Sequence, residues 1–271
     1  MSRPSIEKYV TTRKISRKRF IQLTSLTTTT VLRAPTIFST TTHASKIKAV
    51  AFDAFPIFDP GPIFKRLDEF FPEKAKQIIE VWQSKQFSYQ WLRLSGNRYE
   101  NFWVVTQDAL EFALTQFGLK LSDKEKALVM AGYETLNVWP DVLPALHAIK
   151  SWGLTVCFLS NMTAKMLHQG IQNSNLKDFF DFVISTDEKQ TYKPSPAAYQ
   201  MVVDRLKLKK GEILFVPFAG WDMAGAKWFG YPTFWVNRSG VPPEKLDAEP
   251  DAIGNNLNEL VEFIRKYNGQ F

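Results

Sequence analysis

The part of the chain from Lys46 onward alternates between short apolar runs and helix-length segments, and this alternation limits the fold more than any other feature. The apolar runs typical of buried strands are KAVAF (48–52), LTVCFLS (154–160), FDFVIS (180–185), EILFVPF (212–218) and TFWVN (233–237). Segments of helical length follow at roughly 140–152, 163–174, 195–207, 222–229 and 255–267. A repeated strand and helix predicts a parallel sheet with right-handed crossovers, and so an α/β fold.

The long interval between the first and second predicted strands departs from this pattern. Its segments KAKQIIEVWQSKQFSYQWLRL and ENFWVVTQDALEFALTQFG repeat apolar residues at spacings of three and four, which indicates amphipathic helices. We therefore predict an all-helical cap, residues 62–136, inserted after the first strand. The remaining ranges 46–61 and 137–271 would form a Rossmann-like core, with the cap over the carboxyl edge of its sheet.

The charge of the chain is concentrated in its first fifty residues. The whole chain has 271 residues, 45% of them hydrophobic, which suffices for one core, and a net charge of +7. Residues 1–50 hold ten Lys and Arg against one acid, whereas residues 51–271 hold 24 Lys and Arg against 26 acids. The folded body is thus close to neutral and offers no electrostatic reason to expect a nucleic-acid partner.

Residues 1–45 are rich in Ser and Thr, nearly free of acid and without periodicity, so we expect a leader outside the fold. The segment SRKRFI (16–21) resembles a twin-arginine export signal with lysine at the second arginine position, and residues 42–44 could precede cleavage. We expect export to the periplasm, with an organelle transit peptide or a cytoplasmic chain as the alternatives. No run of about 18 apolar residues exists, so no membrane span is predicted.

Polar residues follow the predicted strands at the points where they end. Asp53 follows the first strand, Ser160 closes the second, Lys193 lies in the loop after the third, and Asp222 follows the fourth. The carboxyl ends of parallel strands meet at one crevice, where ligands bind in open α/β sheets. Each residue alone could be a helix cap or a solvated side chain. Their recurrence at four strand ends predicts one shared site, with Tyr199 on the first turns of the following helix.

Other catalytic arrangements have little support in the sequence. Cys157 is the single cysteine and lies inside an apolar run, while His43, His147 and His168 have neither metal-ligand spacing nor a triad partner. No G-x-S-x-G elbow, G-x-G-x-x-G loop or P-loop lysine motif is present. We therefore predict neither a metal nor a cofactor.

Together these stretches amount to a family resemblance. FDAFPIFD, LSNM, YKPSPAAY and GWDMAGAKWFGYPTFWVNRSG, with the cap segment FSYQWLRLSGNRYENFW, resemble the haloacid dehalogenase (HAD) superfamily and its L-2-haloacid dehalogenase type II branch. The resemblance covers residues 47–268. It implies hydrolytic dehalogenation of small (S)-2-haloacids, or of a related 2-substituted carboxylic acid, through a covalent aspartyl ester. A homodimer built through the helical lobe is consistent with it.

The resemblance also implies roles for the polar residues. Asp53 would be the nucleophile, Lys193 would pair with it and keep it ionised, and Asp222 would orient Lys193 or the hydrolytic water. Tyr199 would hold the hydrogen bonds of the site. Ser160 and Asn161 would bind the substrate carboxylate with hydroxyl and backbone donors.

The apolar part of the site is also implied, together with several departures from the family pattern. Phe55, Phe102 and Trp221 match positions that line the pocket for the alkyl group of the substrate.

Several positions depart from the family pattern. Gln83 stands where an arginine associated with the departing halide is expected. The further changes are Ile57 for threonine, preceded by Pro56 for glycine, and residues 217–219, Pro-Phe-Ala, for Ser-Ser-Asn. Each lost donor near a departing anion costs about 2.7–4 kcal/mol in the best measured case, so we expect weak halide displacement or a different leaving group.

Two other functions compete with the dehalogenase. The first is a catalytically quiet HAD-like protein that binds a carboxylic acid without turning it over. The second is a phosphatase, the activity of the larger part of the superfamily. A phosphatase would need an acid at the position of Phe55 and a magnesium-binding carboxylate at the position of Phe218, and phenylalanine supplies neither.

Overall fold

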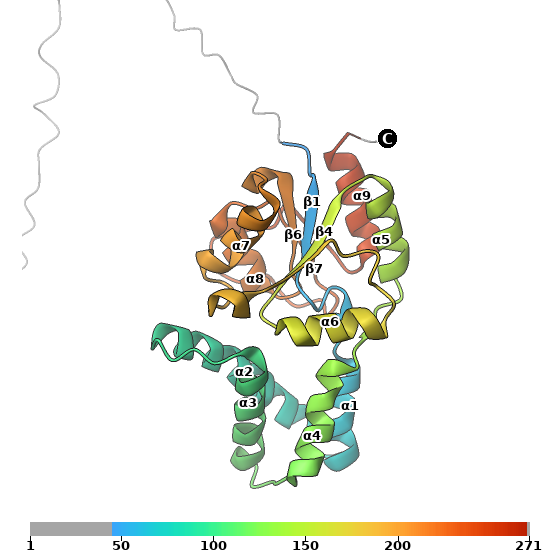
Figure 1. Ribbon diagram of the computed structural model, residues 1–271. Coiled ribbons are helices and arrows are strands. Elements are labelled where there is room, and N and C mark those ends of the chain that lie inside the picture. The colour runs from blue at the N-terminus through green and yellow to red at the C-terminus, as the bar shows by residue number, and fades with distance from the viewer. Residues whose placement is uncertain (1–44, 270–271) are drawn as a thin grey trace, which may run out of the picture. The chain divides into compact units, whose positions relative to one another are not determined.

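A four-stranded parallel sheet forms the centre of the protein, in a computed structural model that describes residues 45–269 (Figure 1). The strand order is β5-β4-β1-β6, formed by β1 (Ala49–Phe52), β4 (Thr155–Ser160), β5 (Phe182–Ser185) and β6 (Ile213–Val216). Every neighbouring pair is parallel. This confirms the predicted α/β class, with strands one to three residues shorter than the apolar runs that predicted them.

Successive side chains along each strand point to opposite faces of the sheet. Val50 and Phe52 pack with α5 (Val142–Ser151), α6 (Ala164–Asn173) and α9 (Leu257–Tyr267). Ala49 and Ala51 face α7 (Pro196–Leu206) and α8 (Gly220–Phe229). Because both faces are covered by helices, β1 is buried throughout, which explains its continuous apolar sequence.

The interval after β1 forms a lobe of helices. These are α1 (Gly61–Phe70), α2 (Ala75–Ser95), α3 (Phe102–Gln116) and α4 (Asp123–Ala131), followed by the 3-10 turn η1 (Gly132–Glu134). Local sequence sets two of the helix starts. The side chain of Asn101 accepts from the backbone N–H of Val104 at 3.1 Å, and Ser122 and Glu125 form a reciprocal capping box.

A short antiparallel pair that the sequence pattern did not indicate connects this lobe to the core. It consists of β2 (Phe58–Asp59) and β3 (Asn137–Val138). Trp139 follows it and donates its indole N–H to the carbonyl oxygens of Phe55 and Phe58, at 3.0 and 3.1 Å. The loop after Asp53 is therefore held by residues some eighty positions later in the chain.

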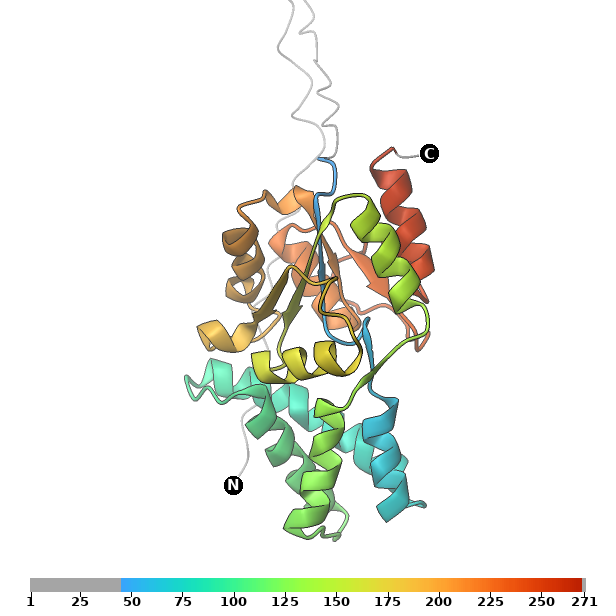
Figure 2. The same cartoon turned by 45° about the vertical axis from the view of Figure 1, so that its right-hand side comes forward.

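The carboxyl ends of β1 and β4 point toward the helical lobe in both views (Figures 1 and 2). Two hydrogen bonds join α2 to residues at this edge of the sheet. The amide of Asn161 donates to the side-chain oxygen of Gln90 at 2.8 Å, and the indole of Trp91 donates to the carbonyl oxygen of Lys193 at 3.2 Å. The lobe thus covers the edge where the polar strand-end residues lie.

The remaining elements complete the core. They are β7 (Phe234–Val236), which pairs in parallel with β8 (Ala252–Gly254), and the 3-10 turns η2 (Thr186–Lys189) and η3 (Lys210–Glu212). Of the predicted leader, only Ser45 falls within the described range. No helix between residues 45 and 269 is both long and apolar enough to cross a membrane.

Candidate active site

Asp53 is placed by the end of β1. Its backbone N–H donates to the carbonyl oxygen of Val216 in β6 at 3.0 Å, so the sheet itself fixes the residue. Its carboxylate oxygen Oδ1 accepts from Lys193 Nζ at 2.8 Å and from Ser160 Oγ at 3.3 Å. The other oxygen, Oδ2, receives only a long bond from the backbone N–H of Phe55, at 3.4 Å. With 14% of its side chain exposed, Asp53 remains accessible to a small ligand.

Lys193 lies between two carboxylates in the interior. Its Nζ is 2.8 Å from Asp53 Oδ1 and 2.6 Å from Asp222 Oδ2, and the residue is only 1% exposed. Burial is the largest single influence on its pKa and lowers it. The charges and hydrogen bonds of Asp222 and Asp53 together outweigh burial and leave the pKa raised, so Lys193 is an ammonium ion at neutral pH.

Asp222, in the first turn of α8, orients this ammonium. Its Oδ2 accepts from Lys193 and its Oδ1 accepts from the phenol of Tyr199 at 2.8 Å. Burial raises the pKa of Asp222 to about 6, against the opposing charge of Lys193. Burial, followed by the charge of Asp222, also raises the pKa of Tyr199 well above its ordinary value. Tyr199 is therefore a neutral hydrogen-bond donor, and it does not contact Asp53 directly.

Gly225 allows α8 to approach this network closely. A Cβ atom at Gly225 would lie 2.5 Å from the phenol oxygen of Tyr199 and 2.5 Å from Cβ of Pro194. Any larger residue would push α8 away from α7 and from the Lys193 loop. The glycine in DMAGA is thus a steric requirement of the hydrogen bond between Tyr199 and Asp222.

Ser160 and Asn161 follow one another at the end of β4, next to Asp53. Ser160 Oγ donates to Asp53 and accepts from the backbone N–H of Met162 at 3.2 Å. The Asn161 Oδ1 atom accepts from the backbone N–H of Lys193 at 2.9 Å and from the hydroxyl of Thr186 at 3.3 Å. The side chain of Asn161 is thereby committed to holding the Lys193 loop, so its backbone is the part left to bind a ligand.

The predicted pocket aromatics divide between two places. Phe55 packs edge to face on Phe218 with ring centroids 6.0 Å apart, beside Asp53. Trp221 contacts Phe87 and Trp91 of α2, at 5.3 and 5.4 Å, where the lobe meets the core. Phe102 is buried against Tyr133 within the helical lobe, at 6.0 Å.

The changed family positions are mostly apolar and mostly buried or half-buried. Ile57 is fully buried and Pro217 is buried, while Phe218 and Ala219 are half-buried. Gln83 is exposed on α2 one turn before Phe87, and residues four apart share a helix face. Gln83 therefore lies on the helix face that carries Phe87 against Trp221.

Phe87, Gln90 and Trp91 were not predicted from the sequence, although all three contact the strand-end residues or their aromatic neighbours. One signal was available. The buried face of α2 consists of Ala75, Ile78, Trp82, Gln86 and Gln90. Glutamine in the buried stripe of an amphipathic helix is unusual, and such a residue needs a polar partner.

The donor set around Asp53 does not suit a magnesium ion. In the part of the chain that the structure describes, no group of three or more His, Cys, Asp or Glu side chains is arranged to hold a metal. The ammonium of Lys193 lies between the two carboxylates, and Phe55 and Phe218 stand where a HAD phosphatase would need carboxylates. Hard cations require oxygen ligands, which these phenylalanines cannot provide.

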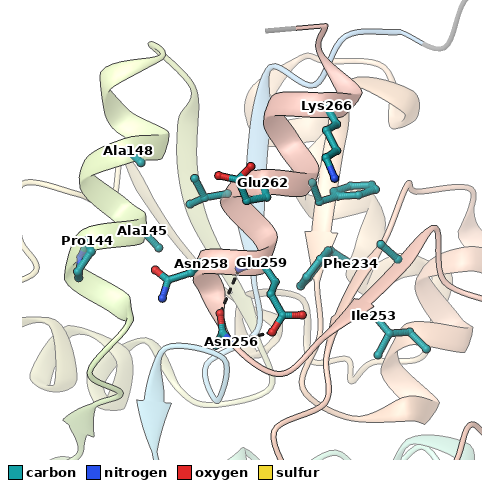
Figure 3. Close-up of a pocket in the computed structure, with 13 residues that line it drawn as sticks. Pro144, Ala145, Ala148, Phe234, Ile253, Asn256, Asn258, Glu259, Glu262 and Lys266 are labelled. Atoms are coloured by element: carbon teal, nitrogen blue, oxygen red, sulfur yellow. Dashed lines mark hydrogen bonds between the residues drawn. The ribbon is translucent and has the colours of Figure 1, made fainter. Parts of the chain in front are cut away.

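A separate hollow of about 660 Å³ lies between α5 and α9 (Figure 3). Within it Asn256 caps α9 by accepting from the backbone N–H of Glu259 at 3.1 Å and donating to the side chain of Glu259 at 2.7 Å. None of its lining residues belongs to the Asp53 cluster, so this groove is not part of the candidate active site.

The fold and site define a class, that of α/β proteins with a parallel sheet, an acidic residue directly after the first strand and a lobe of helices inserted after it. Comparison with known proteins names the family. A model of the haloacid dehalogenase-like hydrolases matches residues 40–230. The chain is 35% identical to the (S)-2-haloacid dehalogenase of Pseudomonas sp. (strain YL) over 83% of its own length and 97% of that protein.

Solved structures agree with this match. A crystal structure of an L-2-haloacid dehalogenase superposes with a TM-score of 0.79 at 36% identity, covering 82% of this chain and all of that one. The L-2-haloacid dehalogenase from Xanthobacter autotrophicus with chloropropionic acid covalently bound superposes with a TM-score of 0.74 at 32% identity, covering 81% and 98%. This protein belongs to the haloacid dehalogenase-like hydrolase family, within its L-2-haloacid dehalogenase branch.

Proposed function

We propose that this protein hydrolyses the carbon–halogen bond of small (S)-2-haloacids, using Asp53 as a covalent nucleophile. The observation that carries the proposal is the cluster in which Lys193 bridges Asp53 and Asp222 at the carboxyl edge of the sheet. Its support is the similarity to a dehalogenase in which chloropropionic acid is covalently bound. A carboxylate nucleophile divides one difficult displacement into two easier steps.

In the first step Asp53 attacks C2 of the acid. Oδ1 is engaged by Lys193 and Ser160, whereas Oδ2 receives only the long bond from Phe55. We assign the attack to Oδ2, since its lone pairs are the freer ones. The carbon–halogen bond breaks as the new C–O bond forms, halide leaves with the bonding pair, and C2 inverts.

In the second step water attacks the carbonyl carbon of the Asp53 ester. The ester C–O bond to the carbonyl breaks, the product leaves as a 2-hydroxy acid, and Asp53 regains a carboxylate that contains one oxygen from water. The balance is haloacid plus water giving hydroxy acid, halide and one proton. Oδ1, which Lys193 contacts, is then the carbonyl oxygen of the ester, and the positive charge of Lys193 stabilises the negative charge that develops on this oxygen.

The carboxylate of the acid would bind at Ser160 and the backbone of Asn161, and its alkyl group against Phe55 and Trp221. An apolar wall excludes water and so strengthens electrostatic attraction inside the site. The half-buried Phe55 packs on Phe218, which supplies such a wall beside Asp53.

A single-turnover reaction in ¹⁸O water tests the proposal. Excess protein is mixed with L-2-chloropropionate without added metal. In the first turnover the product hydroxyl should be unlabelled, because it derives from Asp53, and the protein should gain one ¹⁸O. Tryptic peptide 49–65 contains both Asp53 and Asp59, so fragment spectra must place the label on Asp53. Label in the first-turnover product with none in the protein would contradict the covalent mechanism.

A carboxylic-acid-binding protein without turnover is the second candidate. It is favoured by the exposed Gln83 and by Ile57, Pro217 and Ala219 on the side where family members have polar donors. This candidate predicts that carboxylates bind, that no halide is released from any 2-haloacid, and that no ¹⁸O enters the protein.

The proposal also covers the oligomeric state and the localisation of the chain. We propose a homodimer formed through the helical lobe, supported by the exposed Leu92 and Phe112 on α2 and α3. Light scattering after size exclusion should give twice the chain mass, and a monomer at micromolar concentration would contradict this.

We also propose that the leader directs export of the chain. Mass spectrometry of the mature amino terminus should show cleavage before residue 46, and an intact Met1 would refute export.

A further inference from the structure

Gln90 in α2 carries a buried hydrogen-bond donor for which the described residues provide no partner. The residue is fully buried, and its Nε2 atom is one of three buried side-chain nitrogen or oxygen atoms between residues 45 and 269 that lack a hydrogen bond. A buried amide that stays unpaired costs free energy, so such a group calls for a specific explanation.

The hydrogen-bond network fixes which atom of Gln90 is free. The backbone N–H of Lys193 can only donate, so the Asn161 atom that accepts from it at 2.9 Å must be the oxygen Oδ1. The other terminal atom, Nδ2, must then be the amide nitrogen, and it donates to Gln90 at 2.8 Å. The Gln90 atom that accepts must be its oxygen. The free group is therefore the NH₂ of Gln90, and flipping either amide would set two donors against each other.

The surroundings of Gln90 place this free donor at the junction of lobe and site. Three residues within about one turn of α2 contact the core. Phe87 and Trp91 pack on Trp221, Gln90 accepts from Asn161, and Trp91 also donates to the carbonyl oxygen of Lys193. Asn161 is adjacent to Ser160, whose hydroxyl contacts Asp53. Through Asn161, the Gln90 amide is thus linked to the segment to which the proposed function assigns the carboxylate of the substrate.

We infer that Gln90 is a substrate-binding residue whose Nε2 N–H donates to the carboxylate of an acid held at Ser160 and Asn161. The inference rests on the proposed function for the location of that carboxylate. The substrate carboxylate would then be bound by Gln90 of the lobe as well as by Ser160 and Asn161 of the core. Substrate binding would therefore stabilise the packing of α2 on the end of β4. Hydrogen bonds to charged groups are stronger than those between neutral groups. Gln90 therefore favours ionised acids over their neutral analogues.

Equilibrium binding of propionate, a carboxylate with no leaving group, tests the inference by calorimetry or ligand-observed NMR at pH 7.5. Gln90→Met removes both functions of the amide. Gln90→Glu keeps the oxygen that accepts from Asn161 and removes the N–H. Both variants should weaken propionate binding at least about tenfold, which corresponds to about 1.4 kcal/mol.

Gln86→Met is the matched control. Gln86 lies one turn earlier on the same buried face, but its amide already donates to Thr106 at 2.6 Å and to Tyr133 at 3.3 Å. This variant should lower the melting temperature and leave the Kd for propionate within about twofold of wild type. Circular dichroism at the assay temperature verifies that every variant compared is folded.

Each alternative result identifies a different error. If only Gln90→Met weakens propionate binding, Gln90 merely positions Asn161. If only Gln90→Glu weakens it, the cause is repulsion by the new charge. Either result overturns the inference. Unchanged affinity in both variants would assign the free N–H to an internal water. A wild-type protein that binds no carboxylate would also overturn it. Since none of these measurements needs turnover, wild-type protein that binds propionate tightly through Gln90 yet releases no halide would contradict only the proposed function.

Discussion

The two sides of the carboxylate of Asp53 differ sharply in chemistry. On one side Lys193, Ser160 and Asp222 form a paired, buried network with contacts of 2.6 to 3.3 Å. At the other oxygen, Oδ2, the neighbour is Phe55, which packs on Phe218, and of the changed family positions Ile57 is buried and Gln83 is exposed. The first side holds Asp53, the proposed nucleophile, and it retains every member that the family resemblance implies. Under the proposed function the second side would stabilise the leaving group, and the donors that the family resemblance implies there are replaced.

This contrast suggests that attack and departure contribute unequally to the rate. A carboxylate held by a buried ammonium can attack whichever leaving group the substrate carries. The departing anion, in contrast, is stabilised only by the donors placed around it. In the proposed mechanism the groups that hold Asp53 for attack are all present, whereas those expected beside the leaving group are replaced. Four measurements can break or sharpen this difference.

Removing the nucleophile should have the largest effect. Asp53→Asn is expected to lower turnover of L-2-chloropropionate by at least about 10⁴-fold, because no other carboxylate can form the ester. The half-buried position should tolerate the isosteric amide, so the melting temperature should change little. Halide release by ion chromatography measures the rate, and substantial residual activity in folded Asp53→Asn would eliminate the covalent mechanism.

Removing the ammonium should affect both rate and stability. Lys193→Met leaves Asp53 and the buried Asp222 without their cation, and breaking a buried pair in this way costs about 3–5 kcal/mol of unfolding free energy. Turnover should fall by about 10²–10³-fold, as for other lost electrostatic donors. Urea unfolding and initial rates measure the two effects.

The exposed pair of Lys165 and Glu134 provides the control for this change. It has a similar distance of 2.7 Å, but 79% of the Lys165 side chain is exposed. Lys165→Met should therefore cost less than about 1 kcal/mol and leave turnover unchanged. Equal losses in the two lysine variants would show that burial does not distinguish the active-site pair.

Restoring a cation on the reduced side should raise the rate. Gln83→Arg places a guanidinium on the helix face that carries Phe87 toward Trp221. Turnover of 2-chloro acids is expected to rise by about 10–100-fold, mostly in kcat. Gln77→Arg, which adds the same charge at another exposed position of α2, should have no effect. If both arginine variants leave kcat unchanged, leaving-group departure does not limit the rate.

The smallest effect concerns pH. Burial raises the pKa of Asp222 to about 6, so acidification below pH 6 protonates it and weakens its hold on Lys193. The value of kcat/KM should be about tenfold lower at pH 5 than on its plateau above pH 7, with a limb near pH 6. In Asp222→Asn this limb should vanish, and a limb that persists would belong to another group.

Stability should move in the opposite direction over part of this range. The pKa of Asp222 is higher in the folded protein than its value of 3.8 in the unfolded chain, so the folded state binds its proton more tightly. The contribution of Asp222 to the unfolding free energy is therefore fully present below about pH 3.8 and is lost as the pH rises through about 6. Comparing the slopes of wild type and Asp222→Asn between pH 4 and 6 isolates this contribution.

Local pattern was sufficient to predict much of this protein. Apolar runs at strand spacing and helical periodicity in the interval after Asp53 predicted the parallel sheet and the inserted helices, since both periodicities are properties of a few consecutive residues. Polar residues after successive strands predicted a shared site for Asp53, Ser160, Lys193 and Asp222. The structure brings these four within hydrogen-bonding distance of a neighbour in the set.

Other features of the protein could be seen only in the tertiary structure, because they depend on contacts between residues far apart in the sequence. The pairing of β2 with β3, the commitment of the Asn161 side chain to the Lys193 loop, and the contact of Lys193 with Asp53 all arise from partners at least thirty residues away. Gln90 is the clearest case. In the sequence it is a polar interruption of a helical stripe. Its role emerges only when α2 packs on the edge of the sheet, where one end of its amide finds Asn161 and the other end remains free to bind.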